Sequence, residues 1–264
     1  MSGVAGVAST TIAMLLGDAR LPSGGHAHSA GMEPAFLAGV GHADVRALLA
    51  GRARTSSLVE AGAAVVAMRV LSGAPDASTS DRSGEHAARA DLGPGNGNGN
   101  GNGNGKFGAD RTAELAAVEG AWAARTPSKA QREASRRLGR GLLRLAKATW
   151  PDEPAITACA ALPDPSRAIV LGAIGAACGM NPAELVRAVV YDDAQSAAAA
   201  VLKLDPVDPA RTVRWVLDAC EAAEPFVAEV AACDSPDAIP AAGAPEAEGW
   251  AEAHNLLTRR LFRA

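Results

Sequence analysis

Aromatic residues and strand-forming patterns are scarce in this sequence, and both shortages limit the possible folds. Aromatic side chains account for 3% of the 264 residues. Few segments alternate β-branched with polar residues, as a half-buried strand would, and this argues against a sheet protein. Hydrophobic residues still reach 48%, and the most prominent of them is Ala, the best helix former. The composition therefore favours closely packed helices.

The chain also lacks the marks of a secreted or membrane-spanning protein. Its start has no basic segment ahead of an apolar run, and no stretch of about 20 apolar residues predicts a membrane span. The four cysteines lie far apart and form no CxxC pair. We interpret them as reduced core cysteines of a cytoplasmic protein, rather than as a disulfide pair or a metal site.

Patterns that would indicate catalysis or nucleic-acid binding are missing too. The formal net charge of −4 argues against a general nucleic-acid binder, which is usually basic. The glycine-rich loop at 22–25 has no phosphate-loop lysine, Ser23 lacks the G-x-S-x-G context of a hydrolase, and no HExxH motif occurs. We therefore predict that the protein is not an enzyme and uses no cofactor, although a small helical enzyme with an unrecognised site stays open.

What the sequence does contain is helical periodicity, which predicts an all-α fold with about eight helices in one globular domain, 1–264. The predicted helical segments are 29–40, 44–71, 111–124, 128–149, 166–178, 182–204 and 209–232, followed by an apolar tail at 250–262. Ser29, Asp44, Ser128 and Asn181 are the predicted N-caps. Val213 and Leu217 belong to the apolar stripe of the segment 209–232, which predicts that they face the core.

One segment does not fit this domain. Residues 73–108 have almost no large apolar side chains and contain five consecutive Asn-Gly pairs from Asn96 to Gly105. Such a composition cannot bury enough surface to offset its ordering entropy. We predict a disordered, flexible insertion within the helical domain, which long surface connections tolerate at little cost.

The predicted helix at 128–149 has the most uneven charge in the chain. It carries seven basic residues and one acidic residue, and Arg132, Arg136, Arg140 and Arg144 recur every fourth position. This spacing places the four arginines on one face, here called the basic ridge. The ridge is either a solvated face balanced by acidic neighbours in the fold or a docking surface for an acidic partner.

Two histidines form the other candidate site. His26 and His28 lie two positions apart in the loop after 22–25, and with a third ligand they could hold a transition metal. Their spacing does not place both imidazoles on one helix face, so they would have to converge from a loop. The alternative is that they form hydrogen bonds within a loop packed on the core.

Three segments resemble one known family, the urease accessory protein UreF family. Residues 21–33, LPSGGHAHSAGME, match its pattern of Leu-Pro-x-Gly-Gly, three variable positions, Ser, one variable position, Gly, an aliphatic residue and Glu. The run QREASRRLGRG at 131–141 is similar to its central charged helix, and RLFRA at 260–264 is similar to its Arg-Leu-Phe-x-Ser end. The chain departs from the family at His26, at His28, at LDPVDP in place of Pro-Leu-Gly-Gln, and at Ala264.

The resemblance implies a helical homodimer without a reaction of its own. Such a protein binds a UreD/UreH-type partner and recruits a UreG-type GTPase to the urease apoprotein, where nickel is inserted. The partner-binding residues it implies are Gly24, Gly25, Ser29, Gly31, Glu33, Arg132, Arg136, Arg140, Arg260, Leu261, Phe262 and Arg263. The alternative function is a nickel-binding metallochaperone that uses His26 and His28.

The tail at 259–264 is expected to lack a fixed place in the free protein. Ordering chain ends costs roughly 1–2 kcal/mol of backbone entropy per residue. Burying Leu261 and Phe262 would return about 1.5–3 kcal/mol each, which leaves a balance near zero without a partner. We therefore expect the tail to become ordered in a partner's groove. The alternative is that it folds back on the core of the protein itself.

Overall fold

The computed structural model describes residues 7–18, 21, 28–73, 103–258 and 261–262, with side chains from 111 onward in the first helix after the gap. Within these ranges the chain forms helices, turns and loops and no strand, so the predicted all-α class is confirmed. The segment 74–102, which makes up most of the predicted insertion, lies outside the described residues. The helix that follows it begins at Gly103, inside the predicted insertion boundary.

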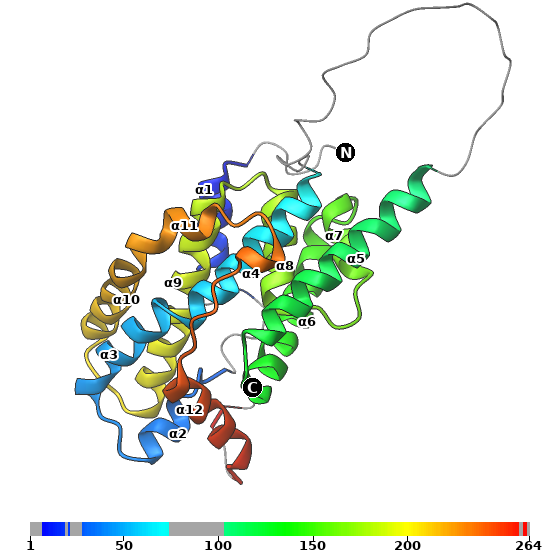
Figure 1. Cartoon of the computed structure of the whole chain (residues 1–264). Helices are drawn as coiled ribbons and strands as arrows, with labels where there is room; N and C mark the ends of the chain where they lie inside the picture. The colour runs from blue at the N-terminus through cyan, green and yellow to red at the C-terminus, as the bar shows by residue number, and fades with distance from the viewer. Residues whose placement is uncertain (1–6, 19–20, 22–27, 74–102, 259–260, 263–264) are drawn as a thin grey trace, which may run out of the picture.

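The elements follow one another as a bundle of antiparallel and crossing helices (Figure 1). They are α1 (Ser9–Leu16), α2 (Met32–Leu37), α3 (His42–Ala53), α4 (Ser56–Ser72), α5 (Gly103–Ala124), α6 (Lys129–Thr149), α7 (Pro154–Ala160), α8 (Arg167–Ala177), α9 (Pro182–Leu204), α10 (Pro209–Ala223), α11 (Val227–Ala231) and α12 (Pro245–Leu256). Two short 3₁₀ turns, Glu224–Phe226 and Pro236–Ala238, lie on either side of α11.

The core is built around α4, which runs through the middle of the bundle between α8 and α9 (Figure 1). Both α4 and α8 are rich in small residues, so their backbones approach closely. A Cβ atom at Gly172 of α8 would lie 2.5 Å from the carbonyl oxygen of Ala64. Only a glycine fits this contact, and most residues of α8 are buried.

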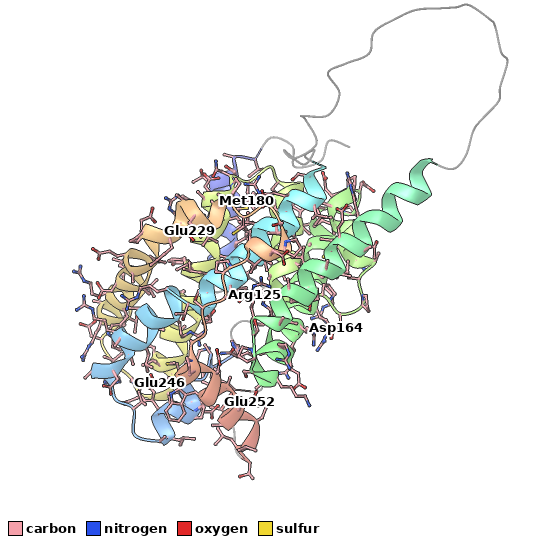
Figure 2. All side chains as sticks on the ribbon, in the orientation of Figure 1. Arg125, Asp164, Met180, Glu229, Glu246 and Glu252 are labelled. Carbon is pink, nitrogen blue, oxygen red and sulfur yellow. The ribbon has the colours of Figure 1, made fainter. Side chains whose placement is uncertain are left out.

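The last helix, α12, lies across one end of the bundle against α6 and α2 (Figure 1). Its Glu252 accepts hydrogen bonds from the Ser128 hydroxyl (2.7 Å) and the Ala130 amide (2.9 Å) at the start of α6. Figure 2 labels Glu252 at this junction. These hydrogen bonds at the N-terminus of α6 hold the pKa of Glu252 below its usual value. The contact fixes the direction in which the chain approaches its C-terminal end.

Two of the four predicted N-caps are confirmed and two were wrong. Ser29 is not an N-cap, because α2 begins at Met32 after Gly31. Ser128 accepts a hydrogen bond from the Gln131 amide (3.1 Å), and Asn181 accepts one from the Ala183 amide (2.9 Å), so both predicted N-caps are confirmed. Asp44 is not the N-cap of its helix. It lies one turn inside α3, where its carboxylate accepts a hydrogen bond from the Gly41 amide at 3.1 Å.

Several predicted boundaries were wrong. The segment 44–71 is two helices, because the chain turns at 54–55 between α3 and α4. The segment 209–232 is broken at Pro225, which cannot continue the hydrogen bonding of α10. No helix was predicted at 154–160, where α7 begins at Pro154; proline is favoured at the first helical position. These divisions give more helices than the eight predicted.

The combined stretch His42–Ser72 is long and apolar enough to cross a membrane by length and composition alone. Most of its apolar window is buried against other helices of the bundle. The turn at 54–55 also interrupts it. Its apolar character is therefore accounted for by its place in the core.

Candidate partner-binding site and central cavity

Most of the described residues of the segment 21–33 are buried in the bundle. Ser29 and Glu33 retain 1% and 5% exposure, and Gly31 adopts a φ of +82° that favours glycine. A Cβ atom at Gly31 would also lie 3.1 Å from the Cβ of Trp250 in α12. Gly24 and Gly25 lie outside the described residues. Gly31 thus allows a close contact between the start of α2 and α12.

Glu33 connects this segment to the C-terminal tail. Its carboxylate accepts hydrogen bonds from the backbone amides of Leu261 (2.5 Å) and Phe262 (3.2 Å). The His254 ring nitrogen Nε2 lies 3.2 Å from the same carboxylate. We call Glu33, His254 and these two amides the tail clamp. A buried carboxylate needs such partners, because an unsatisfied charge in the interior is costly.

The two residues held by the tail clamp face opposite ways. Phe262 is 3% exposed and belongs to the core, with the Lys203 ammonium 5.5 Å from its ring centre. Leu261 is 63% exposed. Arg260 and Arg263 lie outside the described residues. The expectation that the tail has no place in the free protein was wrong for Phe262, because it left out the hydrogen bonds that Glu33 accepts.

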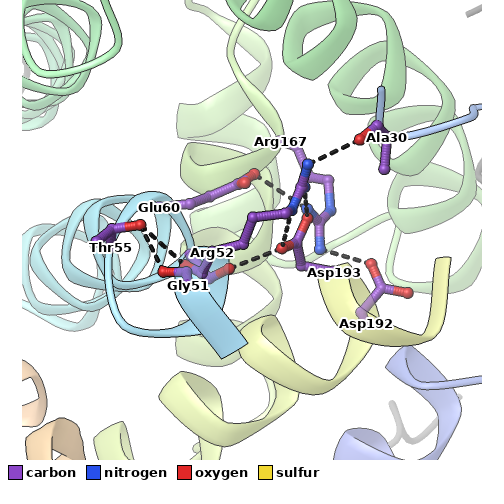
Figure 3. Close-up of polar contacts among 9 residues, drawn as sticks. Ala30, Gly51, Arg52, Thr55, Glu60, Arg167, Asp192 and Asp193 are labelled. Carbon is purple, nitrogen blue, oxygen red and sulfur yellow. Dashed lines mark hydrogen bonds and ion pairs between the residues drawn. The ribbon is translucent and has the colours of Figure 1, made fainter. Parts of the chain in front are cut away.

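A cavity of about 390 Å³ lies beside Phe262 and His254, between α4, α6, α8 and α9. Its wall includes Ser29, Gly31 and Phe262 at one side. Charged side chains from four helices form another part of the wall: Arg52, Glu60, Arg167, Asp192 and Asp193. We call these five residues the buried ion network, which is drawn in Figure 3.

One half of the buried ion network joins α3 to α9. The Arg52 guanidinium makes two contacts with the Asp193 carboxylate and donates to the carbonyl oxygen of Ala30 at 2.8 Å. The Ser57 hydroxyl also donates to Asp193, at 2.7 Å. Figure 3 shows Arg52 extending from α3 toward Asp193 and Ala30. The backbone just before α2 is therefore tied to the helix pair.

The other half joins α8 to α4 and α9. Arg167 donates to Glu60 at 3.2 Å and to Asp192 at 2.5 Å, and both guanidinium contacts appear in Figure 3. Its backbone amide donates to the Ser135 hydroxyl of α6 at 3.1 Å. The position at which α8 begins is thus bound to three other helices.

The buried ion network has three carboxyl groups but only two guanidinium groups. The pKa values of the three carboxyl groups are therefore shifted in different directions. Burial raises the pKa of Glu60 and of Asp192, and the shared Arg167 only partly offsets this effect. Burial also acts on Asp193, but its pairing with Arg52 outweighs it and holds the pKa of Asp193 below its usual value. Asp193 is therefore the firmly ionised member, and Glu60 and Asp192 are the members that take up a proton more readily.

The basic ridge is largely occupied by contacts within the chain. Arg132 donates to the carbonyl oxygens of Thr126 (2.6 Å) and Pro127 (2.8 Å). Arg136 pairs with Glu119 at 3.3 Å, and Arg140 pairs with Asp164 at 2.5 Å. Arg144 and Lys147 remain exposed at the far end of α6. Two of the four ridge arginines, Arg136 and Arg140, are thus paired with acidic residues of the same chain. Arg132 is bonded to backbone carbonyl oxygens instead.

The structure describes only one of the two candidate metal ligands. His26 lies outside the described residues, and His28 lines the central cavity. The described part of the chain contains no group of three His, Cys, Asp or Glu side chains placed to hold a metal ion. The cysteines are free, and burial raises the pKa of Cys159 to about 12 and that of Cys178 to about 11. Such thiols are poor metal ligands and nucleophiles, because the thiolate is the reactive form.

A model of the UreF family matches residues 40–220, which is more than half of the chain. The chain belongs to the UreF family. The match spans α3 to α10 and so includes the whole buried ion network. The tail clamp lies on both sides of it, in α2 and at the C-terminal end.

Curated relatives agree with this UreF assignment. A urease accessory protein UreF of Mycobacterium marinum is 36% identical over 210 residues, covering 76% of this chain and 78% of the relative. The protein of the same name from Mycobacterium tuberculosis is 31% identical over 258 residues, covering 96% and 98%. A third, from Mycolicibacterium vanbaalenii, is 33% identical over 220 residues, covering 81% and 84%. The similarity thus extends over nearly the full length of a UreF protein.

Sequence reasoning did not single out the buried ion network. A signal was present, because Asp192 and Asp193 are adjacent carboxylates in the middle of an apolar helix. Charges in such a place are seldom buried without partners. Their partners, however, lie 25 to 141 positions away along the chain. Neither periodicity nor local spacing indicates which arginines those would be.

Proposed function

We propose that this chain acts in urease maturation as a non-catalytic adaptor. It binds a UreD/UreH-type partner and recruits a UreG-type GTPase to the urease apoprotein, so that nickel can be inserted. The support is the family membership together with the names of the relatives, which are urease accessory proteins. We further propose that it works in the cytoplasm as a homodimer.

The observation that carries the proposal is the way in which the tail clamp presents Leu261. A residue near a chain end normally frays, but the amides of Leu261 and Phe262 are both held by Glu33. Phe262 is inserted in the core, and Leu261 is 63% exposed beside it. A large apolar side chain held at a fixed place on the surface costs little extra entropy to bind. This arrangement suits an anchor residue in a partner's pocket.

The test compares two single substitutions at neighbouring positions. Leu261→Ala removes the exposed side chain and is expected to leave the melting temperature within about 2 °C, since exposed truncations change stability little. It should also weaken co-purification with the UreD/UreH-type partner and reduce urease activation. Leu256→Ala in α12 is the matched control, because Leu256 is also exposed, at 82%, and lies outside the tail clamp.

The outcomes distinguish an error about Leu261 as the anchor residue from an error about the adaptor function. If Leu261→Ala and Leu256→Ala both bind the partner like the unaltered chain, Leu261 is not the anchor. If the unaltered chain itself neither binds the partner nor supports activation, the adaptor function is wrong. Turnover of GTP by the chain, in a preparation free of any GTPase, would contradict its non-catalytic role.

A further inference from the structure

A tight turn just before α2 has an uncommon backbone conformation. The Met32 amide donates to the Ser29 carbonyl oxygen at 2.9 Å, which closes a four-residue turn with Ala30 and Gly31 at its centre. Their φ angles are +50° and +82°, both in the left-handed region. Turns with two such residues are usually built from Gly, Asn or Asp, and Ala is disfavoured because its Cβ is crowded there. Contacts from outside the turn must therefore stabilise it.

Arg52 of α3 provides one of these contacts. Its Nη1 donates to the carbonyl oxygen of Ala30 at 2.8 Å, across 22 positions of the chain, and Figure 3 draws this bond. Ala30 is only 4% exposed. A buried carbonyl oxygen that loses its donor is costly. The bond therefore favours the backbone conformation in which the Ala30 carbonyl group points toward α3.

The direction of the Arg52 side chain is in turn fixed by Asp193 of α9. Arg52 Nε donates to the Asp193 carboxylate at 3.2 Å, and Nη2 pairs with the second carboxylate oxygen. This leaves Nη1 to reach Ala30. A guanidinium group holds its donors in one rigid plane, which an ammonium group does not. One arginine therefore joins the carboxylate of α9 to the turn in a defined geometry.

The turn determines where Glu33 lies. Glu33 follows Gly31 by two positions and belongs to the first turn of α2, a helix of six residues that packs on α9 and α12. Its carboxylate accepts the amides of Leu261 and Phe262. A change of backbone conformation in the turn would rotate the start of this short helix. The Glu33 carboxylate would then move relative to the two amides of the tail.

We propose that Arg52 is a positioning residue for the partner-binding tail. It acts through the Ala30 carbonyl oxygen, the turn and Glu33, and so fixes the place at which Leu261 is presented. The occupant of that surface is the UreD/UreH-type partner, so this inference rests on the proposed function. Arg52 itself is 9% exposed and too deeply buried to serve as an anchor. Its effect on affinity comes from preorganisation, since a fixed anchor loses less entropy on binding.

The test uses Arg52→Lys in the full-length chain. Lysine keeps a positive charge beside Asp193 but lacks the fork that reaches Ala30 at the same time. We expect hydrogen exchange at the Phe262 amide to become about three- to tenfold faster, whereas amides of α8 keep their protection. The affinity for the purified UreD/UreH-type partner should fall about three- to tenfold.

Ser57→Ala is the matched control. The Ser57 hydroxyl donates to the same Asp193 carboxylate at 2.7 Å, so this variant also loses one hydrogen bond of the buried ion network. It leaves the bond between Arg52 and Ala30 in place. Exchange at the Phe262 amide and affinity for the partner should stay unchanged, even where the melting temperature falls as much as in Arg52→Lys. The comparison separates positioning of the tail from a general loss of stability.

A double-mutant cycle with Leu261→Ala tests whether Arg52 acts through the tail. If it does, Leu261→Ala should reduce the affinity by a smaller factor in the Arg52→Lys background than in the unaltered chain. A merely structural role of Arg52 would give the same factor in both backgrounds. Melting curves of all four proteins establish that each one is folded.

A second variant serves if Arg52→Lys does not fold. Arg52→Gln combined with Asp193→Asn removes one positive and one negative charge together, so that no partner of this pair is left as an unpaired buried charge. The shorter glutamine side chain cannot reach Asp193 and Ala30 together. This double variant should show the same faster exchange at the Phe262 amide.

Two results would overturn the inference. In the first, the Phe262 amide exchanges at the same rate in Arg52→Lys, or in the double variant, as in Ser57→Ala. In the second, the losses of affinity from Arg52→Lys and Leu261→Ala are fully additive. If the unaltered chain does not bind the UreD/UreH-type partner, the proposed function is wrong instead. Exchange at the Phe262 amide then still decides whether Arg52 positions the tail.

Discussion

The carboxylate of Glu33 accepts a hydrogen bond from the amide of Phe262, which lies 229 positions further along the chain. The first segment that resembles the UreF family and the last one are therefore parts of one structural unit. Glu33 is an internal ligand of the tail. A partner that binds Leu261 would therefore contact a tail whose position depends on Glu33.

Replacing Glu33 by Gln should loosen the tail without unfolding the bundle. An amide oxygen is a weaker acceptor than a carboxylate, and hydrogen bonds to charged groups contribute about 1.5–3 kcal/mol. We expect hydrogen exchange at the Phe262 amide to become about 10- to 100-fold faster, whereas amides of α8 keep their protection. Unchanged exchange at Phe262 would show that the aromatic ring alone holds the tail.

Phe262 and Leu261 should differ sharply in their effect on stability. Phe262→Ala removes a buried ring and should lower the free energy of unfolding by about 2–3 kcal/mol, measured by urea denaturation. Leu261→Ala removes an exposed side chain and should change it by less than about 0.5 kcal/mol. Equal losses from the two substitutions would contradict the opposite exposure of the two side chains.

Two substitutions in the buried ion network, each replacing a carboxyl group by an amide, should differ in their effect on the free energy of unfolding. Asp193→Asn leaves Arg52 without its counter-charge and should cost about 3–5 kcal/mol. Glu60→Gln removes the excess carboxyl group and should change the free energy of unfolding by less than about 1 kcal/mol at neutral pH, because Arg167 keeps Asp192. Denaturant titrations of both variants and the unaltered chain measure the difference.

The pH dependence of these two variants should differ in sign. The pKa of Glu60 is raised in the folded protein, so its contribution to stability is present below its ordinary value of 4.5 and is lost as pH rises through the raised value. Relative to the unaltered chain, Glu60→Gln therefore becomes more stable with rising pH. The pKa of Asp193 is lowered, so its contribution is present above its ordinary 3.8 and disappears only as pH falls through the lowered value. The deficit of Asp193→Asn should accordingly stay constant from about pH 5 to 8.

Reversing a charge on α6 should destabilise the fold at Arg136 but not at Arg144. Arg136→Glu would face Glu119, whose side chain is 15% exposed and which also accepts a hydrogen bond from the Ser166 amide at 3.1 Å. We expect a loss of about 1 kcal/mol or more, which lowers the melting temperature by about 2–4 °C. Arg144→Glu, at an exposed position, should leave the melting temperature unchanged. If both variants melt like the unaltered chain, the pair with Glu119 contributes nothing.

The parts of this fold that were predictable from sequence depend on near neighbours. The caps at Ser128 and Asn181 involve residues two or three positions away, so their residue types suffice. The all-α class follows from periodicity. The division of 44–71 was missed because the run RARTSS at 52–57 contains neither Pro nor Gly to mark the turn at 54–55. Val213 and Leu217 are 57% and 54% exposed, so the prediction that both face the core was wrong, since periodicity identifies an apolar face but not what covers it.

The candidate sites were predictable only as residue types. The importance of Glu33 and Phe262 followed from the resemblance to a family, but their contact did not, because nothing local connects positions 229 apart. The basic ridge was recognised from its spacing. Its acidic partners Glu119 and Asp164 come from other segments, and they balance the charge of two of its four arginines within the chain.

The opposite exposure of Leu261 and Phe262 also makes the tail sensitive to the number of residues between it and α12. These two adjacent side chains lie on opposite sides of the tail, Phe262 in the core and Leu261 in solvent. One residue inserted between Leu257 and Leu261 would shift this alternation by one step and offer Leu261 to the pocket of Phe262. The segment that joins α12 to the end should therefore accept changes of sequence more readily than changes of length.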